Sequence, residues 1–203
     1  MMGRTGKNTL LENTHGQPTD VQLVESTLRN RQAYGAIVLR YQPILGRYVK
    51  RLLGRHASAV EDVLQVVFIK AYLNLNDYDR ARNFAPWIYR IAHNETITHL
   101  RRRNTQPQTI SGEDAEIILM HIADGDDPHA AWQRGRKKSE MNAALAALKP
   151  QYRDVLVLRY LEEKSYDEIS DILEIPPGTV ATYLSRGLRQ LQAGSNTRAQ
   201  KND

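Results

Sequence analysis

Residues 165–191 read SYDEISDILEIPPGTVATYLSRGLRQL, and the spacing of their apolar residues predicts two short helices joined by a tight turn. Ser165 and Glu168 stand in the S-x-x-E relation of a capping box, which marks the start of the first helix. The Pro-Pro-Gly turn at 176–178 separates the helices, and Thr179 is placed to cap the second. Paired helices of this size are typical of helix-turn-helix units, in which the second helix enters a DNA groove.

The second predicted helix has one apolar face and one face suited to DNA. We expect the apolar residues at helical spacing, Leu188 among them, to point inward. The outward residues can bond phosphate or base edges, and they are Thr179, Thr182, Tyr183, Ser185, Arg186 and Arg189. The alternative interpretation is a helical hairpin that packs in a core and binds nothing.

Composition excludes several classes of protein. The chain has 203 residues, a formal net charge of +5 and no cysteine, which excludes a disulfide framework, a thiol nucleophile and a thiolate metal site. The longest apolar run, residues 143–148, is too short to span a membrane, and the N-terminus has no secretory h-region. We therefore expect a cytoplasmic protein without membrane insertion, long enough for two small domains and a linker.

The N-terminal half predicts an all-α domain of four helices. The strongest periodicity covers residues 37–53, where Pro43 should kink the helix without ending it. A shorter helix is expected at 20–28. Residues 61–75 are apolar nearly all round, as expected of a helix buried on several sides, and a fourth helix covers 84–103.

An acidic stretch separates this half from the helix-turn-helix unit. Residues 104–132 carry six Asp or Glu and no Lys or Arg, with Pro and Gly interspersed and one short helix expected at 115–122. Helices are then expected again from 138–148 and 151–162 onward. The predicted organisation is a disordered tail (1–19), a first helical domain (20–104), an acidic linker (105–136), a second helical domain (137–193) and a polar tail (194–203).

Basic and aromatic residues alternate in NDYDRARNFAPWIYRIAHN, residues 76–94. Single-stranded DNA needs such a combination, because bases stack on aromatic rings while Arg neutralises phosphate. A pocket of this kind can also hold a flipped base. Phe84 and Trp87 are equally consistent with packing in a core.

Two blocks of the sequence resemble bacterial RNA polymerase sigma factors of the sigma-70 family. The segments EDVLQVVFIKAYLNL, FAPWIYRIAHN and LRRR, within 61–103, resemble the helices of region 2. LKPQYRDVLVLRYLEEKSYDEISDILEIPPGTVATYLSRGLRQL, residues 148–191, resembles region 4. Two domains without a third between them resemble the extracytoplasmic-function (ECF, group 4) subfamily. The fold implied is all-α, with two helical domains joined by the acidic linker.

The resemblance implies a role for each candidate residue. The residues that would open the −10 promoter element and hold its single strand are Arg80, Arg82, Asn83, Phe84, Trp87, Arg90, Asn94, Arg101 and Arg102. Those that would dock on the β′ coiled coil of core RNA polymerase are Asp62, Gln65, Val66 and Phe68. The helix from Thr179 would read the −35 element of promoter DNA.

Other implied partners are the β subunit flap of the polymerase and an anti-sigma factor. The linker would thread toward the polymerase active centre. No metal or cofactor is implied.

The chain departs from the family pattern at positions that bear on these roles. Val66 stands where an acid is usual, and Ala181 stands where Lys or Arg is usual in the recognition helix. Glu174 occupies a turn position where Gly is common, and a positive φ there would cost about 1 kcal/mol.

Three other functions remain as alternatives. One is an ordinary helix-turn-helix regulator, and another is a degenerate sigma-like protein that binds polymerase without initiating transcription. An enzyme is disfavoured, because His93, Glu95 and His99 do not have the H-E-x-x-H spacing of a metal site.

Overall fold

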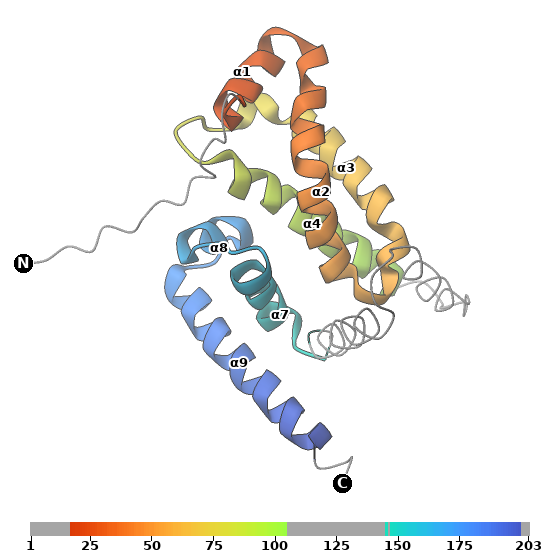
Figure 1. The fold of residues 1–203 in the computed structure, drawn as a ribbon, viewed down its shortest axis with the longest axis vertical. Coiled ribbons are helices and arrows are strands. Elements are labelled where there is room, and N and C mark those ends of the chain that lie inside the picture. Colours follow the sequence, from red (N-terminus) through yellow and green to blue (C-terminus); the bar gives the residue numbers. More distant parts are fainter. Residues whose placement is uncertain (1–16, 105–144, 146, 200–203) are drawn as a thin grey trace, which may run out of the picture.

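The computed structural model describes residues 17–104, 145 and 147–199, and every regular element within them is a helix (Figure 1). The N-terminal unit contains α1 (Asp20–Arg29), η1 (Arg31–Ala33), α2 (Tyr34–Leu53), η2 (Gly54–Ala59), α3 (Val60–Leu73), η3 (Leu75–Asp77) and α4 (Phe84–Asn104). The C-terminal unit contains α7 (Pro150–Leu156), η4 (Val157–Leu161), α8 (Tyr166–Leu173) and α9 (Pro177–Ala199). The predicted all-α fold is confirmed.

Local signals in the sequence explain where the first helices begin and end. The Thr19 hydroxyl accepts a bond from the Gln22 N–H at 3.3 Å, and the Gln22 side chain bonds the Thr19 N–H in return. α2 continues through Pro43 and ends where Gly54 adopts a φ of 55°. Gly is favoured there because it has no Cβ to clash in that conformation.

α2 is the central helix of the N-terminal unit and packs against α1, α3 and α4. Its inward face includes Ile37, Leu45, Tyr48 and Val49, none of which has measurable exposure. Burying an aliphatic side chain of this size contributes about 1.5–3 kcal/mol.

α3 is less enclosed than its apolar composition predicted. Val66 is 41% exposed, Ile69 53% and Leu73 69%. At this spacing the three side chains share one face of the helix. We call them the α3 ridge. The expectation that α3 would be buried on several sides is therefore wrong for this face.

The C-terminal unit contains the predicted helical pair with a modified start to its second helix. Ser165 and Glu168 form the predicted capping box, with reciprocal bonds of 2.8 and 3.1 Å. α9, however, begins at Pro177, and the Thr179 N–H bonds the Pro176 carbonyl at 2.8 Å. The expectation that Thr179 caps α9 is wrong, because the helix already begins two residues earlier. Pro177 is well suited to the first helical position, where its missing N–H would have had no partner within the helix.

The inward face of α9 follows the predicted apolar spacing at Val180, Leu184 and Leu191, and differs at Leu188. Gly187 is buried against α7, whereas Leu188 is 38% exposed. Tyr183, expected to point outward, is half-buried, and its ring centroid lies 5.6 Å from that of Tyr152. The small Gly187 lets α9 approach α7 closely, which turns Leu188 outward.

Several sequence predictions lie outside the described residues, including the acidic linker, the short helix at 115–122 and nearly all of the helix at 138–148. α9 continues to Ala199, into the segment predicted as a polar tail. No helix in the described ranges is both long and apolar enough to cross a membrane.

Replacing Gly187 by Ala should destabilise the protein. A Cβ at this position would lie 2.8 Å from Leu156 Cδ1 and 3.3 Å from Tyr152 Cβ, which forces α7 and α9 apart. Overpacking costs about 1–3 kcal/mol and outweighs the roughly 1 kcal/mol gained from helix propensity. Thermal unfolding should show a lower Tm. Gly178→Ala is the matched control, because its Cβ would meet no atom within 4 Å; equal Tm changes in both variants would contradict this account.

Candidate nucleic-acid interface

The loop before α4 is folded by its own polar groups. The Asp79 carboxylate accepts a bond from the Ala81 N–H at 2.9 Å, and the Asp79 carbonyl accepts one from the Arg82 N–H at 3.0 Å. The Tyr78 hydroxyl donates to the Arg82 carbonyl and closes the turn. This arrangement leaves Arg80, Arg82 and Asn83 exposed.

An aromatic cluster supports the loop from beneath. Phe84 is 2% exposed, and its ring centroid lies 5.2 Å from that of Tyr78 and 5.4 Å from that of Tyr41. Trp87 packs at 5.2 Å on Phe84 but is only half-buried. Phe84 is thus a core residue that holds Trp87 in place, and Trp87 is the one of the two with an accessible surface for stacking.

The remaining candidates follow α4. Arg90 is partly buried, and its Nη1 lies 3.2 Å from Glu174 Oε1 of the C-terminal unit. Its Nε is buried and has no hydrogen-bond partner among the described residues. Asn94, Arg101 and Arg102 are exposed along the same helix.

The outward face of α9 carries most of its predicted side chains. Thr182, Ser185, Arg186 and Arg189 are exposed, while Thr179 is half-buried. The Thr182 hydroxyl donates to the Gly178 carbonyl at 2.9 Å. Tyr183 packs on Tyr152 and is less available than expected.

The candidate docking residues on α3 divide into two sets. Asp62, Gln65 and Val66 are exposed. Phe68 is 8% exposed, and its carbonyl accepts a 2.7 Å bond from the Tyr34 hydroxyl, so its side chain belongs to the core. Ile69 and Leu73 of the α3 ridge are exposed apolar residues that sequence reasoning missed. The only sequence signal was their spacing from Val66, which places all three residues on one face of the helix.

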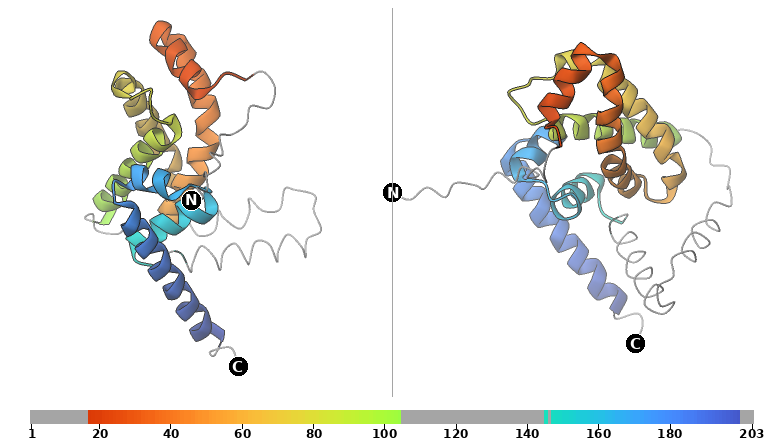
Figure 2. Two further views of the ribbon diagram at one scale, coloured as in Figure 1. Left: turned by 90° about the vertical axis from the view of Figure 1, so that its left-hand side faces the viewer. Right: turned by 45° about the horizontal axis from the view of Figure 1, so that its top comes forward.

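The two units meet where α8 packs against α4, as all views in Figures 1 and 2 show. At the centre of the contact, Glu162 accepts bonds from Arg51 and, at 2.8 Å, from the Tyr89 hydroxyl. Its side chain is only 4% exposed. Burial, followed by the Glu162 charge, raises the pKa of Tyr89, which keeps the phenol protonated as the donor. We call Arg51, Tyr89 and Glu162 the interunit cluster; nothing in the sequence pattern indicated it.

A second pair of titratable groups lies across the same contact. His93 Nε2 of α4 lies 3.9 Å from Asp154 Oδ2 of α7, and His93 Nδ1 lies 3.1 Å from the Tyr48 hydroxyl. Burial, aided by Arg153, lowers the pKa of His93 to about 4. Burial raises the pKa of Asp154 to about 6, although Arg153 opposes the shift. Both groups therefore titrate far from their ordinary ranges.

The residues of the metal-site alternative have other partners. Glu95 accepts a 2.6 Å bond from Lys70, and His93 faces Tyr48 and Asp154. His99 is partly buried.

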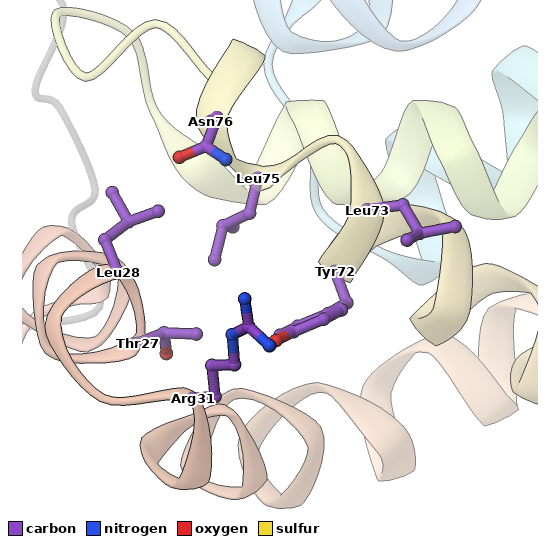
Figure 3. A pocket seen from close by; sticks show the side chains of 7 residues that line it. All are labelled: Thr27, Leu28, Arg31, Tyr72, Leu73, Leu75 and Asn76. Atoms are coloured by element: carbon purple, nitrogen blue, oxygen red, sulfur yellow. The ribbon is translucent and has the colours of Figure 1, made fainter.

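A hollow of about 410 Å³ lies between α1, η1 and the end of α3. Figure 3 shows the Arg31 side chain, one of the lining residues, lying beside the Tyr72 ring. The remaining lining residues are Thr27, Leu28, Leu73, Leu75 and Asn76. Arg31 is the one charged residue that lines this hollow. The hollow therefore offers fewer groups for binding a charged ligand than the basic face of α4 does.

Comparison with known proteins identifies the family. The family described as Sigma-70 region 2 matches residues 37–106, and Sigma-70, region 4 matches residues 138–191. The ECF RNA polymerase sigma factor SigW of Bacillus subtilis is 34% identical over 167 residues, covering 80% of this chain and 89% of that protein. The RNA polymerase sigma-H factor of Pseudomonas aeruginosa is 34% identical over 176 residues, covering 84% and 90%. The chain therefore belongs to the ECF family of RNA polymerase sigma factors, which as a class are not enzymes.

Solved structures share the fold at lower identity. CnrH in complex with the cytosolic domain of CnrY is 22% identical, with a TM-score of 0.65, covering 89% of this chain and 99% of that one. RpoE of Bartonella quintana, solved with the anti-sigma factor NepR, is 20% identical, with a TM-score of 0.58, covering 79% and 94%.

His93 and Asp154 should give opposite pH dependences of stability. The folded pKa of Asp154 is raised, so its contribution is present below about pH 4 and is lost as pH rises through about 6. The folded pKa of His93 is lowered, so its contribution is present above about pH 6.5 and is lost as pH falls through about 4. In the wild-type protein these two opposite changes in stability with pH largely cancel between about pH 4 and pH 6.

Single substitutions should separate the two slopes. His93→Gln should lose stability as pH rises from 4 to 6, and Asp154→Asn should gain it, each by about 2–3 kcal/mol. Thermal unfolding at several pH values measures both. Variants that keep the flat wild-type profile would show that the pair does not titrate as described.

Proposed function

We propose that this sigma factor binds core RNA polymerase, recognises −35 and −10 promoter elements, assists promoter melting and initiates transcription of a specific set of genes. One observation carries the proposal. An exposed basic loop leads directly into α4, whose first turns carry the half-buried Trp87, in a chain that also carries a helix-turn-helix unit. Double-stranded recognition and single-strand capture are thus available in one molecule.

The −10 strand is captured by stacking and by charge. Trp87 offers a ring on which an unstacked base can lie, and Asn94 can bond a base edge. Arg80 and Arg82 neutralise phosphates from the loop, and Arg90 does so from α4. Base stacking of this kind contributes about 1–3 kcal/mol per base, enough to help hold melted DNA open.

The −35 element is read in the major groove by α9. Arg186 and Arg189 are the side chains long enough to reach phosphates or guanine edges, and Ser185 and Thr182 add hydroxyl donors. Ala181 supplies none of the phosphate contact that a basic residue would give.

Core polymerase docks on the exposed face of α3. Asp62 and Gln65 provide polar contacts for the β′ coiled coil, and the α3 ridge adds apolar area beside them. The C-terminal unit contacts the β flap. Since the relative RpoE was solved with an anti-sigma factor, we also propose that one binds this protein. The protein acts in the cytoplasm, where polymerase and DNA are.

Trp87→Ala should impair promoter melting more than promoter binding. The stacking surface is lost, so open complexes should fall by about 10- to 100-fold. Run-off transcription with core polymerase on genomic fragments identifies templates, and permanganate reactivity then measures melting. Arg29→Ala, at an exposed position of α1, is the control.

A wild-type protein that co-purifies with no polymerase, or that needs an added sigma factor, would instead be a helix-turn-helix regulator.

Ala181→Lys should strengthen binding to −35 duplex DNA. The new cation adds one phosphate contact, so the slope of log affinity against log salt should steepen by about one ion. Holoenzyme binding at several salt concentrations measures this slope. Gln192→Lys, exposed farther along α9, is the control; an equal effect there would mean that only net charge matters.

A further inference from the structure

Acidic residues of the C-terminal unit pair with two of the candidate strand-binding arginines. Glu174 Oε1 lies 3.2 Å from Arg90 Nη1, and Asp171 Oδ1 lies 3.7 Å from Arg82 Nη1. Both acids come from the end of α8, which packs on α4 (Figure 2). The carboxylates thus stand where DNA phosphates would stand in the proposed function.

Glu174 holds this position at a conformational cost. It follows α8 with a φ of 55° and a ψ of 41°, the left-handed conformation in which Gly is favoured. Non-Gly residues persist in this region when surrounding contacts over-determine them, and such positions cluster at functional sites. The contact that Gly would lose here is the ion pair with Arg90.

The ion pair has the properties of a contact that can be displaced. The Glu174 side chain is 62% exposed, so salt and solvent weaken its attraction to Arg90. The carboxylate is also an incomplete partner, because Arg90 Nε is buried without a hydrogen-bond partner among the described residues. A phosphate can bond two nitrogens of a guanidinium at once.

We propose that Glu174, assisted by Asp171, is an internal competitor of DNA that occupies Arg90 and Arg82 in the free sigma factor and inhibits strand binding. The inference rests on the proposed function, in which these arginines contact the −10 strand. Release exposes both arginines together as α8 leaves α4. The interunit cluster lies outside the set of strand-binding candidates, so competition by DNA acts on Glu174 and Asp171 rather than on Glu162.

The chain supplies a matched control for the backbone effect. Glu163 also has a φ of 55° and is exposed, and it makes no ion pair with a described residue. Glu163→Gly therefore relieves the same kind of backbone strain without freeing an arginine. Glu174→Gln removes the charge and keeps the strain, whereas Glu174→Gly removes both.

Two measurements on the full chain test the proposal. Because the protein has no cysteine, Lys50→Cys and Gln192→Cys provide a unique pair of labels whose energy transfer reports the separation of the two units. A fluorescent pool of random single-stranded DNA dodecamers, followed by anisotropy at low salt, reports strand affinity.

Glu174→Gln and Glu174→Gly should lower energy transfer and raise DNA affinity about 2- to 5-fold, as expected for one exposed ion pair. Glu163→Gly should change neither. High salt should remove the difference between variant and wild type. Unchanged energy transfer and affinity in both Glu174 variants would overturn the inference.

Arg90→Ala separates this inference from the proposed function. It should lower energy transfer like the Glu174 variants, because the ion pair is lost, but it should weaken DNA binding. Weaker DNA binding with unchanged energy transfer would refute the internal competitor and leave strand binding standing. Lower energy transfer with unchanged DNA affinity would refute the strand contact of Arg90.

Discussion

The buried carboxylate of Glu162 links the two halves of this sigma factor. A charge that is 4% exposed is tolerable only when it is paired, and Arg51 and Tyr89 provide the pairing from two different helices. Removing one partner of such a group typically costs about 3–5 kcal/mol, so Arg51 and Tyr89 are needed to keep Glu162 at this contact. Glu162 lies just before α8, so this pairing helps to hold α8 on α4, where Glu174 reaches Arg90.

The contact also places carboxylates beside part of the proposed strand-binding face. Arg90 is partly buried beside Glu174, and the exposed Arg82 lies near Asp171 of α8, whereas Arg80, Asn83 and Asn94 are exposed. The proposed docking surface on α3 lies on another helix and is exposed in the same structure.

Local features of the fold were predictable from the sequence, whereas the contacts between distant segments were not. The helix ends at Ser165 and Gly54 follow from capping and from backbone sterics, which act over a few residues. Phe68 and Tyr183 were misplaced because the face a side chain takes depends on tertiary packing, here burial of Phe68 in the core and contact of Tyr183 with Tyr152. The pairing of Glu162 could not be predicted for the same reason, since its partners lie far away in the sequence.

The wide helical turn η4, which precedes Glu162, makes this arrangement sensitive to chain length. η4 (Val157–Leu161) is a π-helix, in which the Glu162 N–H bonds the Val157 carbonyl at 3.0 Å across one extra residue. Deleting one residue there restores an ordinary α-helical turn and rotates all that follows by about 100° about the helix axis. Glu162 then points away from Arg51. The coupling between the two halves can therefore change through the loss of a single codon, with every proposed DNA-contacting residue retained in the sequence.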